Sequence, residues 1–291
     1  MRLRFLTAIR VPDVPSPLVA QVAELLRLRG HQVELVIAER ELLDFGDLTP
    51  DCDLYVLKSH TELSLSVAAA LDEQGTRLLN PLAVCAATHD KARSHRRLAA
   101  ADVPVPRTLV TGDYACAADA LRSETPLIVK PVRGHRGVDV EVIRTPEQLR
   151  GRRAPRSPLL VQEYVPGPGE DLKVYVVGQR VWAVRKPFSR VSFTRTGRPV
   201  PVPDEVADIA LRAGVALGLG LYGVDIVEGP RGPVVVDVNN YPGYKGCADV
   251  AAPMASYIEA YARGDIDLHL PAFADLPSAT PLTGTTLKPA S

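Results

Sequence analysis

Two neighbouring apolar segments with polar side chains at fixed positions constrain this chain more than any other feature. Residues 222–228 carry Asp225 in their middle, and residues 234–239 carry Asp237 and Asn239. Between them, the sequence Gly-Pro-Arg-Gly-Pro over residues 229–233 predicts a tight reversal, so the two segments should pair as a β-hairpin. Because alternate residues of a strand share a face, Asp237 and Asn239 should point the same way, with Asp225 roughly opposite Val236 and Asp237.

These three side chains are candidate metal ligands. Two carboxylates and an amide offer hard oxygens, which suit a Mg²⁺ ion that keeps some waters and bridges phosphates. A lone Asp at a strand end is more often a cap or a turn residue. However, an uncompensated charge after three valines would cost on the order of several kcal/mol. From the spacing alone, the metal site and the structural alternative stay equally open.

Composition narrows the classes of function. The chain has 291 residues with 34 basic and 34 acidic side chains, so it lacks the basic excess of a nucleic-acid-binding protein. Four scattered cysteines without a Cys-x-x-Cys pair argue against a zinc site or a disulfide framework and favour a cytoplasmic protein. The N-terminus lacks the apolar core of a signal peptide, and no apolar run is long enough to span a membrane.

The length suits about two domains or one large α/β unit. An opening βαβ pattern predicts a parallel sheet, in a first unit that closes near residue 88. A mixed α and β region follows, and Pro, Ser and Thr dominate from Asp265 onward, where we expect a loosely ordered tail. The expected strands are 3–9, 32–37, 53–58, 77–79, 127–130, 138–143, 159–165, 173–177 and 180–184, and the expected helices are 18–29, 64–74, 90–101, 204–217 and 248–261.

Two lysines are candidate phosphate contacts. Lys130 ends an apolar strand and precedes a loop that contains Gly134 and Gly137, and glycines let backbone amides approach phosphate oxygens. The loop is neither a Walker A nor a Rossmann motif. Lys91 opens a helix, and helix starts favour anions. Solvated lysines remain the alternative for both residues.

Further polar groups follow buried strands. Residues 160–165 could present backbone groups to an adenosine, with Glu163 or Asp171 on the ribose hydroxyls. On the next hairpin, alternation should turn Arg185 and Lys186 to opposite faces, so one of them could face the phosphates while the other is solvated.

These motifs, in this order, resemble the ATP-grasp superfamily over about residues 1–262. The resemblance is carried by Asp90-Lys91 with Ser94, Val129-Lys130-Pro131 with its glycine loop, residues 162–165, and Asp225, Asp237 and Asn239 with Pro242-Gly243. It implies an ATP-grasp fold that combines α/β and α+β parts. An N-terminal Rossmann-like βαβ domain (1–88) would precede a two-lobed ATP-grasp domain (89–264) and an irregular tail (265–291).

The resemblance also implies site roles, with ATP and Mg²⁺ (or Mn²⁺) as cofactors. The implied metal ligands are Asp225, Asp237 and Asn239. The implied nucleotide contacts are Lys91, Lys130, Gly134, Gly137, Gln162, Glu163, Tyr164, Val165, Asp171 and Lys173. Lys130, Arg185 and Lys186 would be catalytic, and Lys58, His135, Arg136, Gly243 and Lys245 would bind substrate. The chain departs from the common pattern at His135-Arg136, where richer glycine is usual, and at Asp237, where Glu is usual.

Two branches of the superfamily fit these motifs. One comprises the RimK-type carboxylate–amine ligases, and the other the inositol trisphosphate 5/6-kinases, which phosphorylate a hydroxyl. A basic acceptor pocket fits a polyphosphate or a polycarboxylate; its candidates are Arg10, Lys58, His60, Arg133, His135, Arg136 and Lys245. We predict an ATP-dependent ligase that forms an amide or peptide bond through an acyl phosphate, releasing ADP and phosphate, with the kinase as the alternative.

A catalytically inactive nucleotide-binding module is a third hypothesis, against which the intact Lys91, Lys130 and Asp237 argue. We expect a small-molecule acceptor as the partner, with neither nucleic acid nor membrane, and the oligomeric state, including a homo-oligomer, stays open. His95 has no recognisable partner pattern, and we expect it to be a structural or surface residue.

Overall fold

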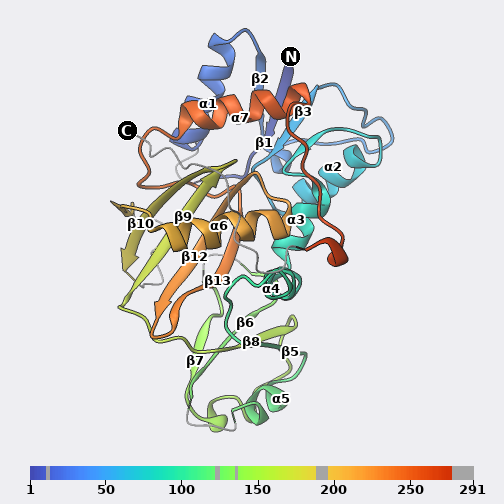
Figure 1. The fold of residues 1–291 in the computed structure, drawn as a ribbon. Helices are drawn as coiled ribbons and strands as arrows, with labels where there is room; N and C mark the ends of the chain where they lie inside the picture. The colour runs from blue at the N-terminus through green and yellow to red at the C-terminus, as the bar shows by residue number, and fades with distance from the viewer. Residues whose placement is uncertain (11–13, 122–124, 135–136, 188–195, 277–291) are drawn as a thin grey trace.

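The computed structural model describes residues 1–276 except 11–13, 122–124, 135–136 and 188–195. Three sheets organise this part of the chain (Figure 1). The N-terminal sheet has the order β2-β1-β3-β4 and is parallel throughout, which confirms the predicted βαβ opening. Its strands are β1 (Arg2–Leu6), β2 (Gln32–Val36), β3 (Leu54–Leu57) and β4 (Leu78–Leu79).

Helices from both ends of the chain cover this sheet. Helix α1 (Pro17–Leu28) begins as predicted, with the Ser16 side chain accepting the Val19 amide and Pro17 at the first helical position. It packs beside α7 (Ala251–Arg263), and both contribute to one core with the strands (Figure 1). The remaining helical elements of this region are η1 (Ala38–Arg40), α2 (Glu62–Asp72) and α3 (Leu82–His89).

The central sheet is antiparallel, with the order β11-β10-β9-β12-β13. Helix α6 (Asp204–Leu217) covers one of its faces, where Leu172, Val174 and Ile226 lie in the core. The predicted hairpin is β12 paired with β13, and Asp225 lies opposite Asp237 as expected. The strands are β9 (Glu170–Val177), β10 (Arg180–Pro187), β11 (Arg198–Val200), β12 (Leu221–Gly229) and β13 (Gly232–Asn240).

A smaller antiparallel sheet, β5-β8-β6-β7, lies at the end of the molecule opposite the N-terminal sheet (Figure 1). Helix α4 (Lys91–Ala100) leads toward it, and the Asp90 side chain caps α4 by accepting the Arg93 amide. The strands are β5 (Thr108–Thr111), β6 (Leu127–Pro131), β7 (Glu141–Ile143) and β8 (Leu159–Glu163), with α5 (Tyr114–Asp119) and η2 (Pro146–Gln148) beside them.

The expectation of loose order from Asp265 onward is wrong for residues 265–276. Leu268, Leu270 and Leu276 pack against the two main cores, and a short helix, η3 (Phe273–Asp275), forms there. Arg97 on α4 donates to the Pro271 carbonyl at 2.5 Å. A few well-spaced leucines are enough to dock a segment whose overall composition is polar, and composition alone hides them. Residues 277–291 lie outside the described residues.

In the described part of the chain, no helix combines the length and the apolar character that crossing a membrane requires.

Candidate functional site

The polar site lies on the face of the central sheet that α6 does not cover. In the strand register, Lys186 lies opposite Asp171, Lys173 opposite Asp225, and Asp225 opposite Asp237. Directly opposite residues of antiparallel strands point to the same side, so four adjacent strands bring these five charges together. Farther along, the same face becomes apolar at Tyr175, Val177 and Val184, which belong to the core.

Lys173 links two of the acids. Its Nζ lies 2.7 Å from Asp225 Oδ2 and 3.6 Å from Asp171 Oδ2. Burial lowers the pKa of Lys173, but the two carboxylates outweigh this effect and raise the pKa above its usual range. Burial raises the pKa of Asp171 to about 6, against the opposing influence of Lys173. The cation of Lys173 therefore holds Asp225 in place in the ligand-free protein.

Asp237 is held by the first residue of α4. Lys91 Nζ donates to both carboxylate oxygens of Asp237, at 2.8 and 3.0 Å. Burial alone would raise the pKa of Asp237, but Lys91 and Lys130 lower it below its usual value. The two residues that we expected to contact phosphate and metal thus neutralise one another.

A β-bulge explains how Lys130 and His95 join this site. The register shifts after Asp225, because Ile226 pairs with Val235 and leaves Val236 without a partner on β12. The carbonyl of Val236 instead accepts from Lys130 Nζ at 3.0 Å and lies 3.2 Å from His95 Nε2. Burial lowers the pKa of Lys130 to about 8. The bulge therefore fixes a lysine of the small sheet beside the hairpin of the large sheet.

His95 lies buried beside this site, and the sequence had predicted a structural or surface role for it. Burial lowers the pKa of His95 to about 4, so the ring is neutral at pH 7. A neutral ring that donates from Nε2 to Val236 accepts at Nδ1, and the Gln162 amide nitrogen lies 3.2 Å from Nδ1. Gln162 Nε2 also lies 2.9 Å from Thr108 Oγ1. His95 is four residues after Lys91, one turn along the same helix face, and that spacing was the available signal.

The small sheet presents both polar and apolar side chains on the face that carries Lys130. Thr108, Gln162, Ile128 and Val142 lie side by side in the register and therefore share that face. Val142 is 38% exposed and Val140 is 41% exposed. Exposed apolar side chains next to Lys130 and Gln162 can contact the flat face of a base while the polar groups contact its edges or its phosphates.

The other predicted nucleotide contacts lie along the connection between the two sheets. Glu163 lies at the end of β8 and binds Arg231 at 3.2 Å. The Tyr164 amide donates to the Pro126 carbonyl at 3.0 Å, and Val165 packs near Gly229. Gly134 and Gly137 lie in the loop between β6 and β7, with φ of +70° at Gly137. These positions suit the predicted roles but do not test them.

Of the two basic residues that alternate on β10, the structure brings only Lys186 to the polar face. Lys186 is 3% exposed, and burial, Lys173 and Lys245 all lower its pKa. The Arg185 guanidinium forms a two-pronged ion pair with Glu228, at 2.5 and 2.9 Å, on the side of the sheet that α6 covers. The predicted alternation is confirmed, and Lys186 is the member of the pair that can reach the site.

The predicted substrate residues that the structure describes lie in two places, with Lys58 at the N-terminal sheet and Gly243 and Lys245 in the segment after β13. Lys58 directly follows β3, and its Nζ donates to the Tyr241 carbonyl at 2.6 Å. Gly243 is exposed just beyond β13, and Lys245 is close enough to Lys186 to affect its pKa. His135 and Arg136 lie outside the described residues.

The donor set suits a hard cation that substrate oxygens help to bind. Asp225 and Asp237 are directly opposed, and Asn239 lies two residues further on the same face, opposite Gly223. In the described residues, no group of three or more His, Cys, Asp and Glu side chains could hold a metal ion. Two carboxylates and one amide would leave several positions for waters and phosphate oxygens, as Mg²⁺ requires.

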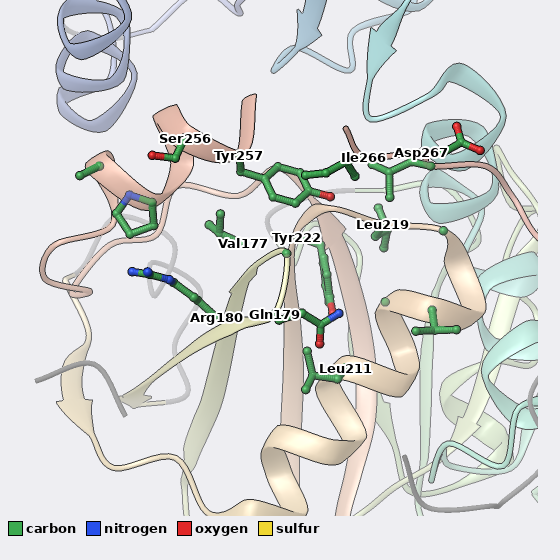
Figure 2. A pocket seen from close by; sticks show the side chains of 17 residues that line it. Val177, Gln179, Arg180, Leu211, Leu219, Tyr222, Ser256, Tyr257, Ile266 and Asp267 are labelled. Carbon is green, nitrogen blue, oxygen red and sulfur yellow. The ribbon is translucent and has the colours of Figure 1, made fainter. Parts of the chain in front are cut away.

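A separate cavity of about 780 Å³ lies between α6, α7 and the turn from β9 to β10 (Figure 2). Leu211, Leu219, Tyr222 and Tyr257 line it, with Arg180 at its edge. Its lining includes none of the charged residues of the polar face, so size alone does not identify the chemical site.

Comparisons with known proteins agree with this arrangement. The sequence model of the RimK-like ATP-grasp domain matches residues 88–258. A probable alpha-L-glutamate ligase of Xanthomonas euvesicatoria pv. vesicatoria (strain 85-10) is 31% identical, over 70% of this chain and 76% of that protein. Another, from Teredinibacter turnerae (strain ATCC 39867 / T7901), is 28% identical, over 84% of this chain and 91% of that protein.

Solved structures share the fold. A RimK domain ATP-grasp protein from Sphaerobacter thermophilus DSM 20745 superposes with a TM-score of 0.71 at 24% identity, covering 88% of this chain and 99% of that one. The ATP-grasp ligase PsnB, solved with a minimal precursor, Mg and ADP, gives a TM-score of 0.66 at 22% identity, covering 90% of this chain and 97% of that one. At these identities the likeness shows the fold alone.

Proposed function

The chain belongs to the RimK-like ATP-grasp family of ligases, and from this premise we propose that it joins a carboxylate to an amine through an acyl phosphate, releasing ADP and phosphate. The observation that carries the proposal is the convergence of Asp225 and Asp237 with Lys91 and Lys130 between the two antiparallel sheets. Phosphoryl transfer needs positioning and charge stabilisation more than covalent chemistry, and this site offers both signs of charge in fixed positions.

We assign the nucleotide to the space between the small sheet and the polar face of the central sheet. Ile128, Val140 and Val142 supply an apolar surface for the base, and Gln162 and residues 163–165 supply polar groups at its edge. Lys91 and Lys130 then lie where phosphates would lie. Both lysines currently contact groups of β13, so phosphate binding would exchange those contacts rather than leave the lysines unpaired.

Asp225, Asp237 and Asn239 would hold Mg²⁺, which supplies charge neutralisation at the phosphates. When a cation and phosphates enter together, Asp237 can leave Lys91 for the cation while Lys91 turns to phosphate. Lys173 can meanwhile continue to position Asp225, because its Nζ donates to one oxygen of that carboxylate, Oδ2, at 2.7 Å. Lys186, buried beside Lys173, adds positive charge near the transferred group.

The relatives named alpha-L-glutamate ligase make L-glutamate the first substrate to test. ³¹P NMR of the purified protein with Mg-ATP, L-glutamate and a panel of amino acids and short peptides should show ADP and free phosphate. Their release should require both a carboxylate and an amine, and mass spectrometry should find the amide. A phosphate ester without free phosphate would instead establish a kinase, and binding of ATP without turnover on any acceptor would favour a non-catalytic module.

A further inference from the structure

The carboxyl ends of β1 and β3 form a second place where ligand-binding groups gather. These strands are neighbours in the N-terminal sheet, with Leu6 opposite Leu57, and the chain continues from them to opposite edges of the sheet. In parallel sheets, ligands bind outside the carboxyl ends of strands at such a point of divergence. Here the segment that follows β1 carries Arg10, and Lys58 directly follows β3.

Lys58 is a half-buried cation without a carboxylate partner in the described part of the chain. Its Nζ donates to the Tyr241 carbonyl at 2.6 Å and lies 4.9 Å from the centre of the Tyr241 ring. Burial and, after it, the nearby charge of Arg10 together lower the pKa of Lys58 to about 8. Tyr241 directly follows β13, two residues beyond Asn239, so Lys58 lies next to the proposed metal-binding strand.

Arg10 adds an unsatisfied donor. Its Nη1 is buried and has no hydrogen-bond partner among the described residues. A buried donor without a partner and two neighbouring cations without a counter-charge each cost free energy, and an anion between them would remove both costs. The guanidinium fork matches the two oxygens of a carboxylate, and the ammonium of Lys58 adds a point charge.

Arg10 is the charged group that acts on Lys58, so two cations meet at this place. His60 also lies near Lys58, but burial, followed by the charges of Lys58 and His89, lowers the pKa of His60 to about 3, so it stays neutral. Its Nε2 lies 2.6 Å from the Asn240 amide nitrogen, which it can accept only as a neutral ring. Two cations suit one carboxylate better than a group of several phosphates, which the polyphosphate alternative would require.

We propose that Arg10 and Lys58 form a subsite for a second carboxylate of the substrate, one that lies on the side chain of an acidic amino acid and takes no part in the reaction. This subsite rests on the proposed function, because it lies beside Asn239 and would anchor the substrate of that same reaction. It restricts the substrate to molecules with a second, unreacted carboxylate, such as acidic amino acids or peptides that contain them.

Isothermal titration calorimetry of the full chain with Mg-ADP tests the subsite without turnover. The probes are L-glutamate and L-glutamine, which differ by one carboxylate. Arg10→Gln and Lys58→Gln should each weaken L-glutamate binding about tenfold or more, and L-glutamine should bind the unaltered protein correspondingly less tightly. Arg2→Gln is the matched control, because Arg2 lies at the opposite end of β1 in an exposed contact with Asp51; it should change binding less than about twofold.

Unchanged L-glutamate binding in both variants would overturn the subsite even if ligase activity is found. Conversely, carboxylate binding that depends on Arg10 and Lys58, in a protein that ligates nothing, would refute the proposed function and leave the subsite standing. If the protein binds inositol trisphosphate more tightly than L-glutamate, and if both variants bind inositol trisphosphate more weakly, the subsite would be reassigned to phosphate. If Lys58→Gln does not fold, the L-glutamate affinities of Arg10→Gln and Lys58→Arg test the subsite instead. An unchanged Kd for ADP in these variants shows that the nucleotide site is intact.

Discussion

Replacing Asp237 with alanine should have opposite effects on the binding of metal-free ATP and of Mg-ATP. In the ligand-free protein, the carboxylate neutralises Lys91 at 2.8 and 3.0 Å, with the two side chains 12% and 25% exposed. At about 4 Å between charges and an effective dielectric near 20, this attraction is about 4 kcal/mol. Breaking a buried pair costs about 3–5 kcal/mol, and the partial exposure here reduces the expected loss of folding stability to about 2–3 kcal/mol.

That loss leaves a folded protein, because domains of ordinary stability unfold with about 5–15 kcal/mol. Without Asp237, Lys91 is available to phosphates, and the repulsion between the carboxylate and the phosphates is gone. Metal-free ATP should therefore bind about tenfold more tightly to Asp237→Ala, which corresponds to about 1.4 kcal/mol. Mg-ATP should bind more weakly to Asp237→Ala than to the unaltered protein, and turnover should fall at least about a hundredfold, because one of the three proposed metal ligands is missing.

Urea unfolding and calorimetric titration of ATP with EDTA or with Mg²⁺ measure these effects. Asp208→Ala is a suitable control, since Asp208 forms a surface ion pair with Arg212 on α6 at 2.8 Å and should cost less than about 0.5 kcal/mol. The reasoning fails if Asp237→Ala is as stable as the unaltered protein. It also fails if the variant binds metal-free ATP more weakly, or if it retains near-normal turnover.

Three further predictions concern the surroundings of the site. The pKa of His95 is about 4 in the folded protein and about 6.5 when unfolded, so its neutral form stabilises the fold fully above pH 6.5. The free energy of unfolding should fall by up to about 3 kcal/mol as the pH falls toward 4. Urea titrations of His95→Gln should show a smaller loss over this pH range. Lys186→Ala should lower kcat at least about tenfold, because Lys186 faces the site. Arg185→Ala should change kcat less than about threefold, because Arg185 lies on the other face of the sheet. Steady-state ADP release measures kcat for both variants. Gly214→Ala should cost about 1–3 kcal/mol by thermal unfolding, despite the helix preference of alanine, because its Cβ would overlap Tyr222 Oη; a more stable variant would contradict that contact.

Local patterns in the sequence predicted much of the fold. The strand periodicity and the Gly-Pro-rich reversal predicted the hairpin of β12 and β13, including the pairing of Asp225 with Asp237. Helix α6 has the predicted bounds, and the Ser16 cap and Pro17 mark the start of α1 as expected. These features depend on contacts between residues that are close in the chain, so the sequence carries them directly.

Local sequence patterns did not predict the features that depend on long-range contacts. Docking of residues 265–276 depends on cores formed by α4, α6 and α7, and no local pattern reveals those partners. The same reason applies to His95, whose role depends on the bulge at Val236 and on Gln162, which is 67 residues away. The predicted domain bounds and the contribution of each residue to catalysis stay predictions.

The sequence by itself determined which chemical groups this protein can use: two acids and an amide on one face of a hairpin, lysines at the starts and ends of elements, and an alternating Arg185-Lys186 pair. Only the tertiary structure decided which of these groups meet. It paired Lys91 with Asp237 across 146 positions of the chain, turned Lys186 and not Arg185 to the site, and left Arg10 and Lys58 together without a counter-charge among the described residues. The physical reason is that alternation and propensity act over a few residues, whereas burial and charge compensation depend on which distant segments share the same small volume.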